Sequence, residues 1–301
     1  MQRSIPWPCL AVMVGNSRLH WAVLGWEASG LAADRPVAEN RSASAPSSAP
    51  WVSPRTLSSC PAIPTHDSPH LGESKALGES KAIDPWLSYL QDLQFPPAIR
   101  SWLQTQFQPP PLLLASVHPP QAAHFDTYPH LYSLHLDAIP LGQRYPGLGI
   151  DRALALWGAG QKYGWPVLVI DGGTALTLTG GDRSQNLVGG AILPGLGLQW
   201  RSLHQGTAQL PPVQWSIEQG YPDRWARSPQ GAIASGVLHS VLAGLRSFID
   251  DWERQQGTSA IVLTGGDGPL LWQLLNPEYH CDPNLIFTGM AHLPVFAADA
   301  P

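Results

Sequence analysis

Two stretches of this 301-residue chain repeat one pattern, and this repeat constrains the fold more than any other feature. Residues 10–25 read LAVMVGNSRLHWAVLG, and residues 167–180 read VLVIDGGTALTLTG. Each is an apolar strand, a turn that contains glycine, and a returning strand. The superposed pairs are Gly15 with Gly173, Asn16 with Thr174, and Met13 with Asp171. Internal duplication of this kind predicts a fold built from two similar halves.

Small residues follow three of the predicted strands. The three turns are Gly15-Asn16-Ser17, Gly172-Gly173-Thr174 and Gly265-Gly266-Asp267. Glycine lets backbone N–H groups approach a ligand closely and hydroxyls add donors, a combination that suits phosphate oxygens. Asp171, at the end of its strand, adds a carboxylate for the cation that accompanies polyphosphate. Tight hairpins also favour such residues, and one turn alone would indicate only that, but three turns in a duplicated frame favour nucleotide binding.

The bulk composition excludes several classes of protein. The net charge is -5 and only 13% of residues are charged, so no basic surface is available for nucleic acid or anionic lipid. The three cysteines form no C-x-x-C pair, which argues against a disulfide framework or a zinc site. No apolar run reaches the roughly 18 residues of a membrane span. We therefore expect a cytoplasmic protein that binds neither nucleic acid nor membrane.

The chain outside the duplicated motifs reads as alternating strands and helices, apart from one segment. Residues 27–82 are rich in Ser, Ala and Pro and carry LGESKA twice in tandem, so we expect a low-complexity insertion that does not fold by itself. We expect a strand over residues 131–139 and a helix that begins at Asp151. A Gly/Pro turn in GGAILPG should precede another helix. The next helix is long and begins with Ser228 as N-cap and Pro229 in its first position.

The ordered set of motifs GNS, YPGLGIDRALALWGA, DGGTALTLT, GGAILPG and LTGGDG resembles the type III pantothenate kinases, which belong to the actin-like superfamily of sugar kinases and heat-shock ATPases. The resemblance covers the chain outside residues 27–82. It implies an α/β fold of two ribonuclease-H-like domains, residues 1–148 and 149–301, with a nucleotide cleft between them. It also implies ATP-dependent phosphorylation of pantothenate, the first step of coenzyme A biosynthesis, by a homodimer.

The resemblance also assigns roles to individual residues. Asp151 corresponds to the catalytic base, and Asp171 to the ligand of an activating monovalent cation, K⁺ or NH₄⁺. The substrate-binding residues are Tyr145, Gly149, Ile150, Asp151 and Arg152. The residues for ATP, which brings Mg²⁺, are Gly15, Asn16, Ser17, Gly173, Thr174, Gly265 and Gly266. Without the resemblance, the position of Asp151 would favour a helix N-cap, and Arg152 could pair with a surface carboxylate; with the motif intact we favour substrate binding for Arg152.

Three positions depart from the family pattern. Met13 stands where the family has an aspartate that contributes to the metal–phosphate site, and a thioether cannot replace a carboxylate as a ligand for Mg²⁺. Thr179 replaces another aspartate, and Pro229 falls on a substrate-contacting threonine. The alternative to a kinase is therefore a catalytically impaired family member that acts as a ligand-binding regulatory or accessory dimer. Another small-molecule kinase is a third reading, although YPGLGIDR matches no sugar-kinase motif.

Overall fold

The computed structural model describes residues 9–16, 18–24, 55–61, 97–106, 108–213 and 215–294. It contains two five-stranded sheets. The strands of the first sheet are β1 (Cys9–Val14), β2 (Arg18–Leu24), β3 (Arg55–Pro61), β4 (Leu112–Ser116) and β5 (Leu131–Ser133). Those of the second sheet are β6 (Val167–Gly172), β7 (Ala175–Gly181), β8 (Leu187–Pro194), β9 (Ala260–Thr264) and β10 (His280–Cys281).

The two sheets have the same topology. The first has the order β3-β2-β1-β4-β5, and the second has β8-β7-β6-β9-β10 when it is read from its other edge. In both, the first three strands along the chain pair antiparallel, and the last two are parallel to the first. Met13 and Asp171 each occupy the next-to-last position of the corresponding strands. The duplication predicted from the sequence is therefore confirmed, and the chain has the actin-like arrangement of two ribonuclease-H-like sheets.

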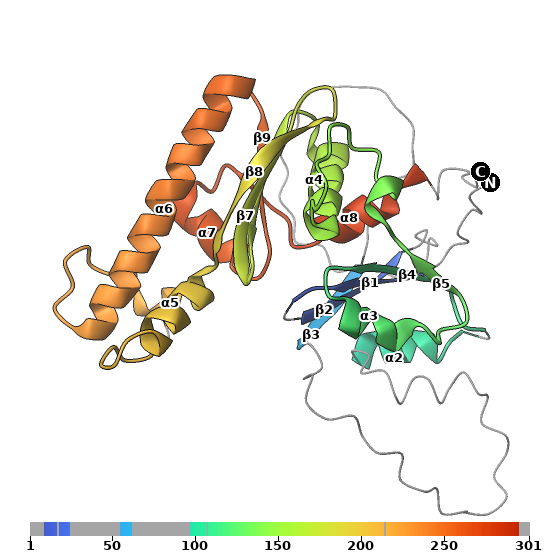
Figure 1. Cartoon of the computed structure of the whole chain (residues 1–301), viewed down its shortest axis with the longest axis horizontal. Helices are drawn as coiled ribbons and strands as arrows, with labels where there is room; N and C mark the ends of the chain where they lie inside the picture. Colours follow the sequence, from blue (N-terminus) through green and yellow to red (C-terminus); the bar gives the residue numbers. More distant parts are fainter. Residues whose placement is uncertain are drawn as a thin grey trace, which may run out of the picture.

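Helices cover both faces of each sheet, so the molecule is built in layers (Figure 1). The main helices are α2 (Pro97–Leu103), α3 (Pro119–Ala122), α4 (Ile150–Tyr163), α5 (Leu196–Gln205), α6 (Pro229–Gln256), α7 (Gly268–Leu275) and α8 (Leu285–Ala291). Short 3-10 turns lie at Ala123–Phe125, Leu136–Ala138 and Ile217–Gln219. Helices α2 and α3 lie on the outer face of the first sheet, and α5, α6 and α7 on the outer face of the second. Helices α4 and α8 lie between the sheets.

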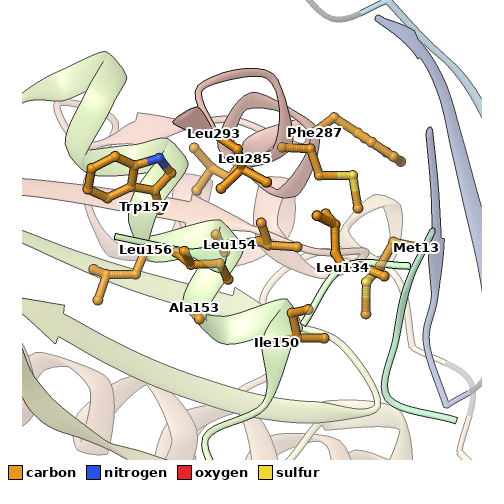
Figure 2. Packing of buried hydrophobic residues seen from close by; sticks show 14 of the residues in the cluster. Met13, Leu134, Ile150, Ala153, Leu154, Leu156, Trp157, Leu285, Phe287 and Leu293 are labelled. Atoms are coloured by element: carbon orange, nitrogen blue, oxygen red, sulfur yellow. The ribbon is translucent and has the colours of Figure 1, made fainter. Parts of the chain in front are cut away.

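A single apolar cluster joins the two halves. It contains Met13 and Ala11 of β1, Val169 of β6, most of α4 and the apolar residues of α8, and Figure 2 shows part of it. Helix α4 is buried on nearly every side from Arg152 to Gly160, as expected for a helix enclosed between two sheets. Burial of so much apolar surface from both halves makes this layer the main connection between them.

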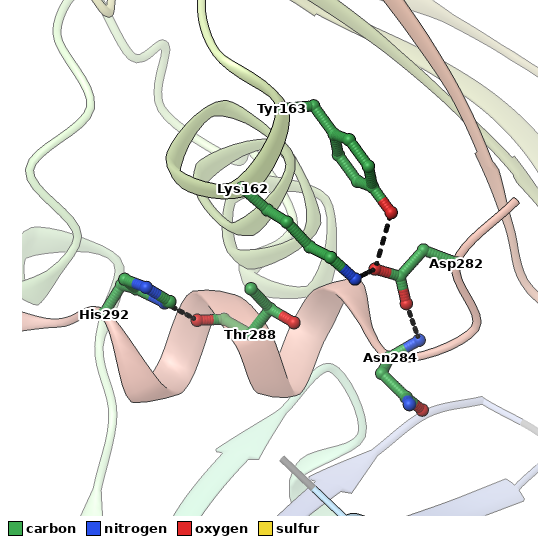
Figure 3. Close-up of polar contacts among 6 residues, drawn as sticks. All are labelled: Lys162, Tyr163, Asp282, Asn284, Thr288 and His292. Carbon is green, nitrogen blue, oxygen red and sulfur yellow. Dashed lines mark hydrogen bonds and ion pairs between the residues drawn. The ribbon is translucent and has the colours of Figure 1, made fainter. Parts of the chain in front are cut away.

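Glycines allow α4 and α8 to pack with their backbones in contact. A Cβ at Gly158 would collide with the carbonyl oxygen of Leu285, and one at Gly289 would collide with the carbonyl oxygen of Leu154. At the far end of α4, Lys162 forms an ion pair of 2.6 Å with the buried Asp282, just ahead of α8 (Figure 3). The close helix contact and this ion pair fix α4 along its length.

The long helix α6 follows the sequence prediction closely. Ser228 is its N-cap and accepts a hydrogen bond from the N–H of Gly231 at 3.1 Å, while Pro229 takes the first helical position. Helical spacing predicts six core positions on this helix, and Phe248 is the exception at 44% exposed. The five buried ones are Ile233, Val237, Val241, Leu245 and Trp252. By length and composition α6 could cross a membrane, but its apolar stripe packs on the outer face of the second sheet, and this packing accounts for its composition.

Three expectations about the elements were wrong. The strand expected over residues 131–139 ends at Ser133 and gives way to a 3-10 turn, because the apolar residues that follow pack as a turn rather than in a ladder. Strand β8 occupies most of GGAILPG, where only a turn was expected. Strand β3 lies inside the 27–82 segment and pairs with β2. Backbone hydrogen bonds hold such an edge strand, and composition does not reveal them.

The close contact of α4 and α8 predicts the response to a single added methyl group. Gly158→Ala should lower the free energy of unfolding by about 1–3 kcal/mol, because the methyl group forces the two backbones apart. Gly236→Ala is the matched control, since this exposed glycine of α6 has nothing within 4 Å of the added Cβ. It should raise the free energy of unfolding by about 0.5–1 kcal/mol through helix propensity. Equal effects of the two substitutions in urea unfolding would contradict the close packing.

Candidate active site

The second and third glycine turns lie side by side at the carboxyl edge of the second sheet. Strands β6 and β9 are adjacent and parallel, with Asp171 opposite Thr264. The N–H of Asp267 donates to the carbonyl oxygen of Gly172 at 2.8 Å, and this bond ties one turn to the other. Two of the three turns predicted to bind a nucleotide are therefore brought together.

Two glycines make this close approach possible. Gly265 has a φ of +82°, and a Cβ there would also collide with the Asp171 carboxylate. Gly195 is the N-cap of α5, and a Cβ there would collide with the carbonyl oxygen of Gly173. Its N–H donates to the carbonyl oxygen of Thr174 at 2.9 Å. The start of α5 and both turns thus form one cradle of backbone groups, and any larger residue at position 195 or 265 would disrupt it.

A row of side chains crosses the second sheet at the level of Asp171. Its neighbours in register are Thr264 on β9 and Thr177 on β7, and Thr177 is paired with Ile192 on β8. Directly opposed residues share a face of the sheet, so this row is on the side of α4. In the first sheet the corresponding row is His20, Met13 and Ala115. The polar surface next to α4 therefore belongs to the second half of the molecule.

Asp171 is half-buried and lies in the field of a second carboxylate. Burial and, as the smaller cause, the negative charge of Asp151 together raise its pKa to about 6. The structure thus brings the two aspartates singled out from the sequence into one site. A buried carboxylate whose proton affinity is raised further by a second carboxylate is typical of a site that holds a cation or moves a proton.

Asp151 occupies the second position of α4 and is not the N-cap. The N-cap is Gly149, two positions before Asp151, and it makes no side-chain capping bond. One oxygen of Asp151 accepts the N–H of Arg152 at 2.8 Å. Burial raises the pKa of Asp151, and this hydrogen bond and the charge of Arg152 oppose the rise in part. The Asp151 carboxylate is thus held in place by the backbone at the start of α4.

Arg152 is buried against β7, with only 7% of its surface exposed. Its Nε donates to the hydroxyl of Thr179 at 3.0 Å and its Nη2 to the carbonyl oxygen of Leu178 at 3.1 Å. Its Nη1 donates to the hydroxyl of Tyr145 at 2.9 Å. Two predicted substrate-binding residues, Arg152 and Tyr145, are therefore in direct contact. The surface ion pair considered for Arg152 is not found among the described residues.

The remaining predicted residues divide into exposed and buried groups. Thr174 and Gly266 are exposed beside the cradle, and Gly173 is partly exposed. Ile150 is only 8% exposed and packs in the core between the sheets, so its backbone alone can contact a ligand. Sequence reasoning missed Thr179 as a partner of Arg152. The signal available was its two-residue spacing from Thr177 along β7, which places both side chains on one face.

The first glycine turn is not joined to the other two by any hydrogen bond among the described residues. Gly15 is partly exposed and Asn16 exposed, while Ser17 lies outside the described residues. Met13 is 1% exposed and belongs to the apolar cluster between the sheets (Figure 2). Position 13, where the family pattern has a carboxylate, is thus part of the core.

The donors present fit a monovalent cation better than a divalent metal bound by protein alone. The described residues include no group of three or more His, Cys, Asp or Glu side chains placed to hold a metal ion. Asp171 offers one desolvated carboxylate near backbone carbonyl groups, which suits a weakly charged cation. A site for Mg²⁺ would need ligands from phosphate and water, as Mg²⁺ commonly has in nucleotide sites.

Comparisons with known proteins agree with this architecture. A crystal structure of a conserved Baf family protein from Campylobacter jejuni, described as a transcriptional activator, covers 93% of this chain and 94% of that chain, with a TM-score of 0.50 and 18% identity. At that identity the likeness concerns the fold alone. Fold and site together define a protein of the actin-like fold with two neighbouring aspartates at the edge of its second sheet.

The family follows from sequence comparison. Residues 101–251 match the family model for type III pantothenate kinase. The type III pantothenate kinase of Synechococcus sp. strain JA-3-3Ab is 54% identical over 166 residues, which cover 54% of this chain and 68% of that protein. That of Nostoc sp. strain PCC 7120 is 48% identical over 189 residues, covering 60% of this chain and 68% of that protein. The chain belongs to the type III pantothenate kinase family.

Burial of Met13 predicts the effect of restoring a carboxylate at this position. Met13→Asp should lower the free energy of unfolding by several kcal/mol, on the order of 3, because an unpaired carboxylate replaces an apolar contact. Met13→Leu, the control, should cost less than about 1.5 kcal/mol. The Michaelis constant for Mg-ATP should not improve in the Asp variant. An improved constant with little loss of stability would show that position 13 faces the nucleotide.

The raised pKa of Asp171 predicts a pH-dependent cost to stability. Native Asp171 holds its proton up to about pH 6, whereas an unfolded aspartate loses it near pH 4, so the free energy of unfolding falls as pH rises through this window. Asp171→Asn removes this loss of stability because the amide does not ionise. Above pH 7 and without K⁺, the variant should be more stable than the wild type by about 1–2 kcal/mol, after allowance for solvent screening.

Urea unfolding at pH 4.5, 6 and 7.5 measures this difference. The exposed Asp250→Asn on α6 serves as the control and should show no such trend. Added K⁺ should reduce the advantage of the Asn variant at pH 7.5. A difference that is constant across the three pH values would contradict the raised pKa.

Proposed function

We propose that this chain phosphorylates pantothenate with ATP to give 4'-phosphopantothenate, the first step of coenzyme A biosynthesis. The observation that carries the proposal is the convergence of Asp151, Asp171 and Arg152 beside the glycine cradle, in a chain that belongs to this family. Phosphoryl transfer needs positioning, charge stabilisation and a proton acceptor, and these three side chains offer all of them.

Asp151 is the proposed catalytic base. The primary hydroxyl of pantothenate gives its proton to the Asp151 carboxylate as its oxygen attacks the γ-phosphorus of ATP. The bond from that phosphorus to the bridging oxygen breaks and ADP leaves. The raised pKa of Asp151 strengthens the carboxylate as a proton acceptor, and the N–H of Arg152 keeps it oriented.

The other predicted residues contact the two substrates. The guanidinium of Arg152 binds the carboxylate of pantothenate. The other residues of the pantothenate site are Tyr145, Gly149 and Ile150. Backbone groups of Gly15, Asn16, Ser17, Gly173, Thr174, Gly265 and Gly266 contact ATP. Mg²⁺ bound to ATP supplies charge neutralisation, and Asp171 would hold K⁺ or NH₄⁺ next to the phosphates.

The assembly is proposed to be a cytoplasmic homodimer with a domain boundary between residues 148 and 149. Ile192 on the edge strand β8 is 66% exposed and Val188 is 46% exposed, and a second copy would cover such apolar side chains. Ile192 is in register with Thr177, beside Asp171, which would place the interface next to the site. A non-catalytic regulatory role is not favoured, because the burial of Met13 in the core leaves the paired carboxylates and Arg152 intact.

Asp151→Asn tests the proposed base. The variant should keep the fold and bind pantothenate, while kcat falls by roughly 10²–10⁴-fold because no group accepts the hydroxyl proton. A coupled assay of ADP release, with and without pantothenate and K⁺ or NH₄⁺, measures the effect. Asp250→Asn on the exposed face of α6 should retain wild-type turnover. Near-normal turnover of Asp151→Asn would exclude this carboxylate as the base.

A further inference from the structure

The guanidinium of Arg152 is held in one orientation by three acceptors from two parts of the chain. Thr179 and the carbonyl group of Leu178 belong to β7, and Tyr145 belongs to the loop before α4. Thr179 is only 2% exposed and accepts the Nε–H, so its bond uses no N–H of the two terminal nitrogens. Gly190 of strand β8 leaves space for the guanidinium, because a Cβ at this position would collide with Arg152.

All three acceptors are neutral, so they accept hydrogen bonds from Arg152 without neutralising its positive charge. Within the described residues, no carboxylate forms an ion pair with Arg152. Arginine stays protonated at any working pH, and a buried cation of this kind favours an anionic partner strongly. The three bonds use three of the five N–H donors and leave one N–H on each terminal nitrogen for a further acceptor.

We propose that Thr179 is a positioning residue, which orients Arg152 for the carboxylate of the substrate without itself neutralising the guanidinium charge. This inference rests on the proposed function, since it concerns how the same site distinguishes a carboxylate-bearing substrate from an uncharged one. Thr179 itself is separated from solvent and acts through Arg152.

Thr179→Val keeps the shape of the side chain and removes the acceptor. The Michaelis constant for pantothenate should rise roughly tenfold with kcat within about twofold, because a hydrogen bond to a charged group is lost. The constant for panthenol, the alcohol analogue without a carboxylate, should change by less than about twofold. Thr179→Ser should restore wild-type behaviour toward both. A purely structural role would alter both substrates alike.

A double-mutant cycle separates coupling from general damage. In an Arg152→Gln background, Thr179→Val should have no further effect on pantothenate binding, because its only route of action has been removed. Thr288→Val is the control for disturbance of the core, because Thr288 is a buried threonine of α8. It should leave the Michaelis constants for pantothenate and panthenol unchanged. Additive effects of Thr179→Val and Arg152→Gln would overturn the proposal, as would equal losses with pantothenate and panthenol.

Calorimetric titration with pantothenate keeps this test independent of turnover. If the wild type fails to phosphorylate pantothenate, the proposed function fails. The positioning role then stands only if the wild type binds pantothenate and Thr179→Val weakens that binding about tenfold. If the wild type is an active kinase and the Val variant binds pantothenate equally well, the positioning role alone is wrong.

Discussion

The contact between α4 and α8 is the constraint on which the rest of the structure depends. Gly158 and Gly289 remove the side chains that would separate the two helices, so the backbones meet in the layer between the sheets. Each sheet packs against this pair of helices. The first turn of α4 carries Asp151 and Arg152, and their position relative to β6 and β7 therefore follows from helix packing. A buried, close-packed helix is a suitable support for groups that must be held within a fraction of an ångström.

The duplicated halves have diverged in the row that faces this helix layer. In the second sheet the row contains Asp171 between two threonines, and in the first sheet Met13 lies at the same level between His20 and Ala115. Topology is shared, but the chemistry is concentrated in the second half. The apolar row in the first half adds surface to the core that holds the halves together. One copy of the motif thus serves stability while the other supplies the reactive groups.

The features that depend on a local pattern of residues could be predicted from the sequence. The duplicated strands, and the start of α6 at Ser228 and Pro229, follow from spacing and residue type. The missed features depend on partners distant in the chain. Strand β8 contains Gly189 and Gly190, which weaken any strand pattern, and Gly190 is needed there because Arg152 of α4 approaches it. Strand β3 is held by its pairing with β2, which composition does not reveal.

The charges of the site suggest how its ligands depend on one another. The charge of Asp151 raises the pKa of Asp171, whereas the guanidinium of the buried Arg152 donates its hydrogen bonds to neutral acceptors. Under the proposed function, a monovalent cation at Asp171 relieves the first imbalance and the carboxylate of pantothenate relieves the second. Each ligand then neutralises a charge that the folded protein has partly removed from water. Part of the stability lost by burying that charge is therefore recovered as binding free energy. A site arranged in this way is least stable when empty and gains most from having both ligands present.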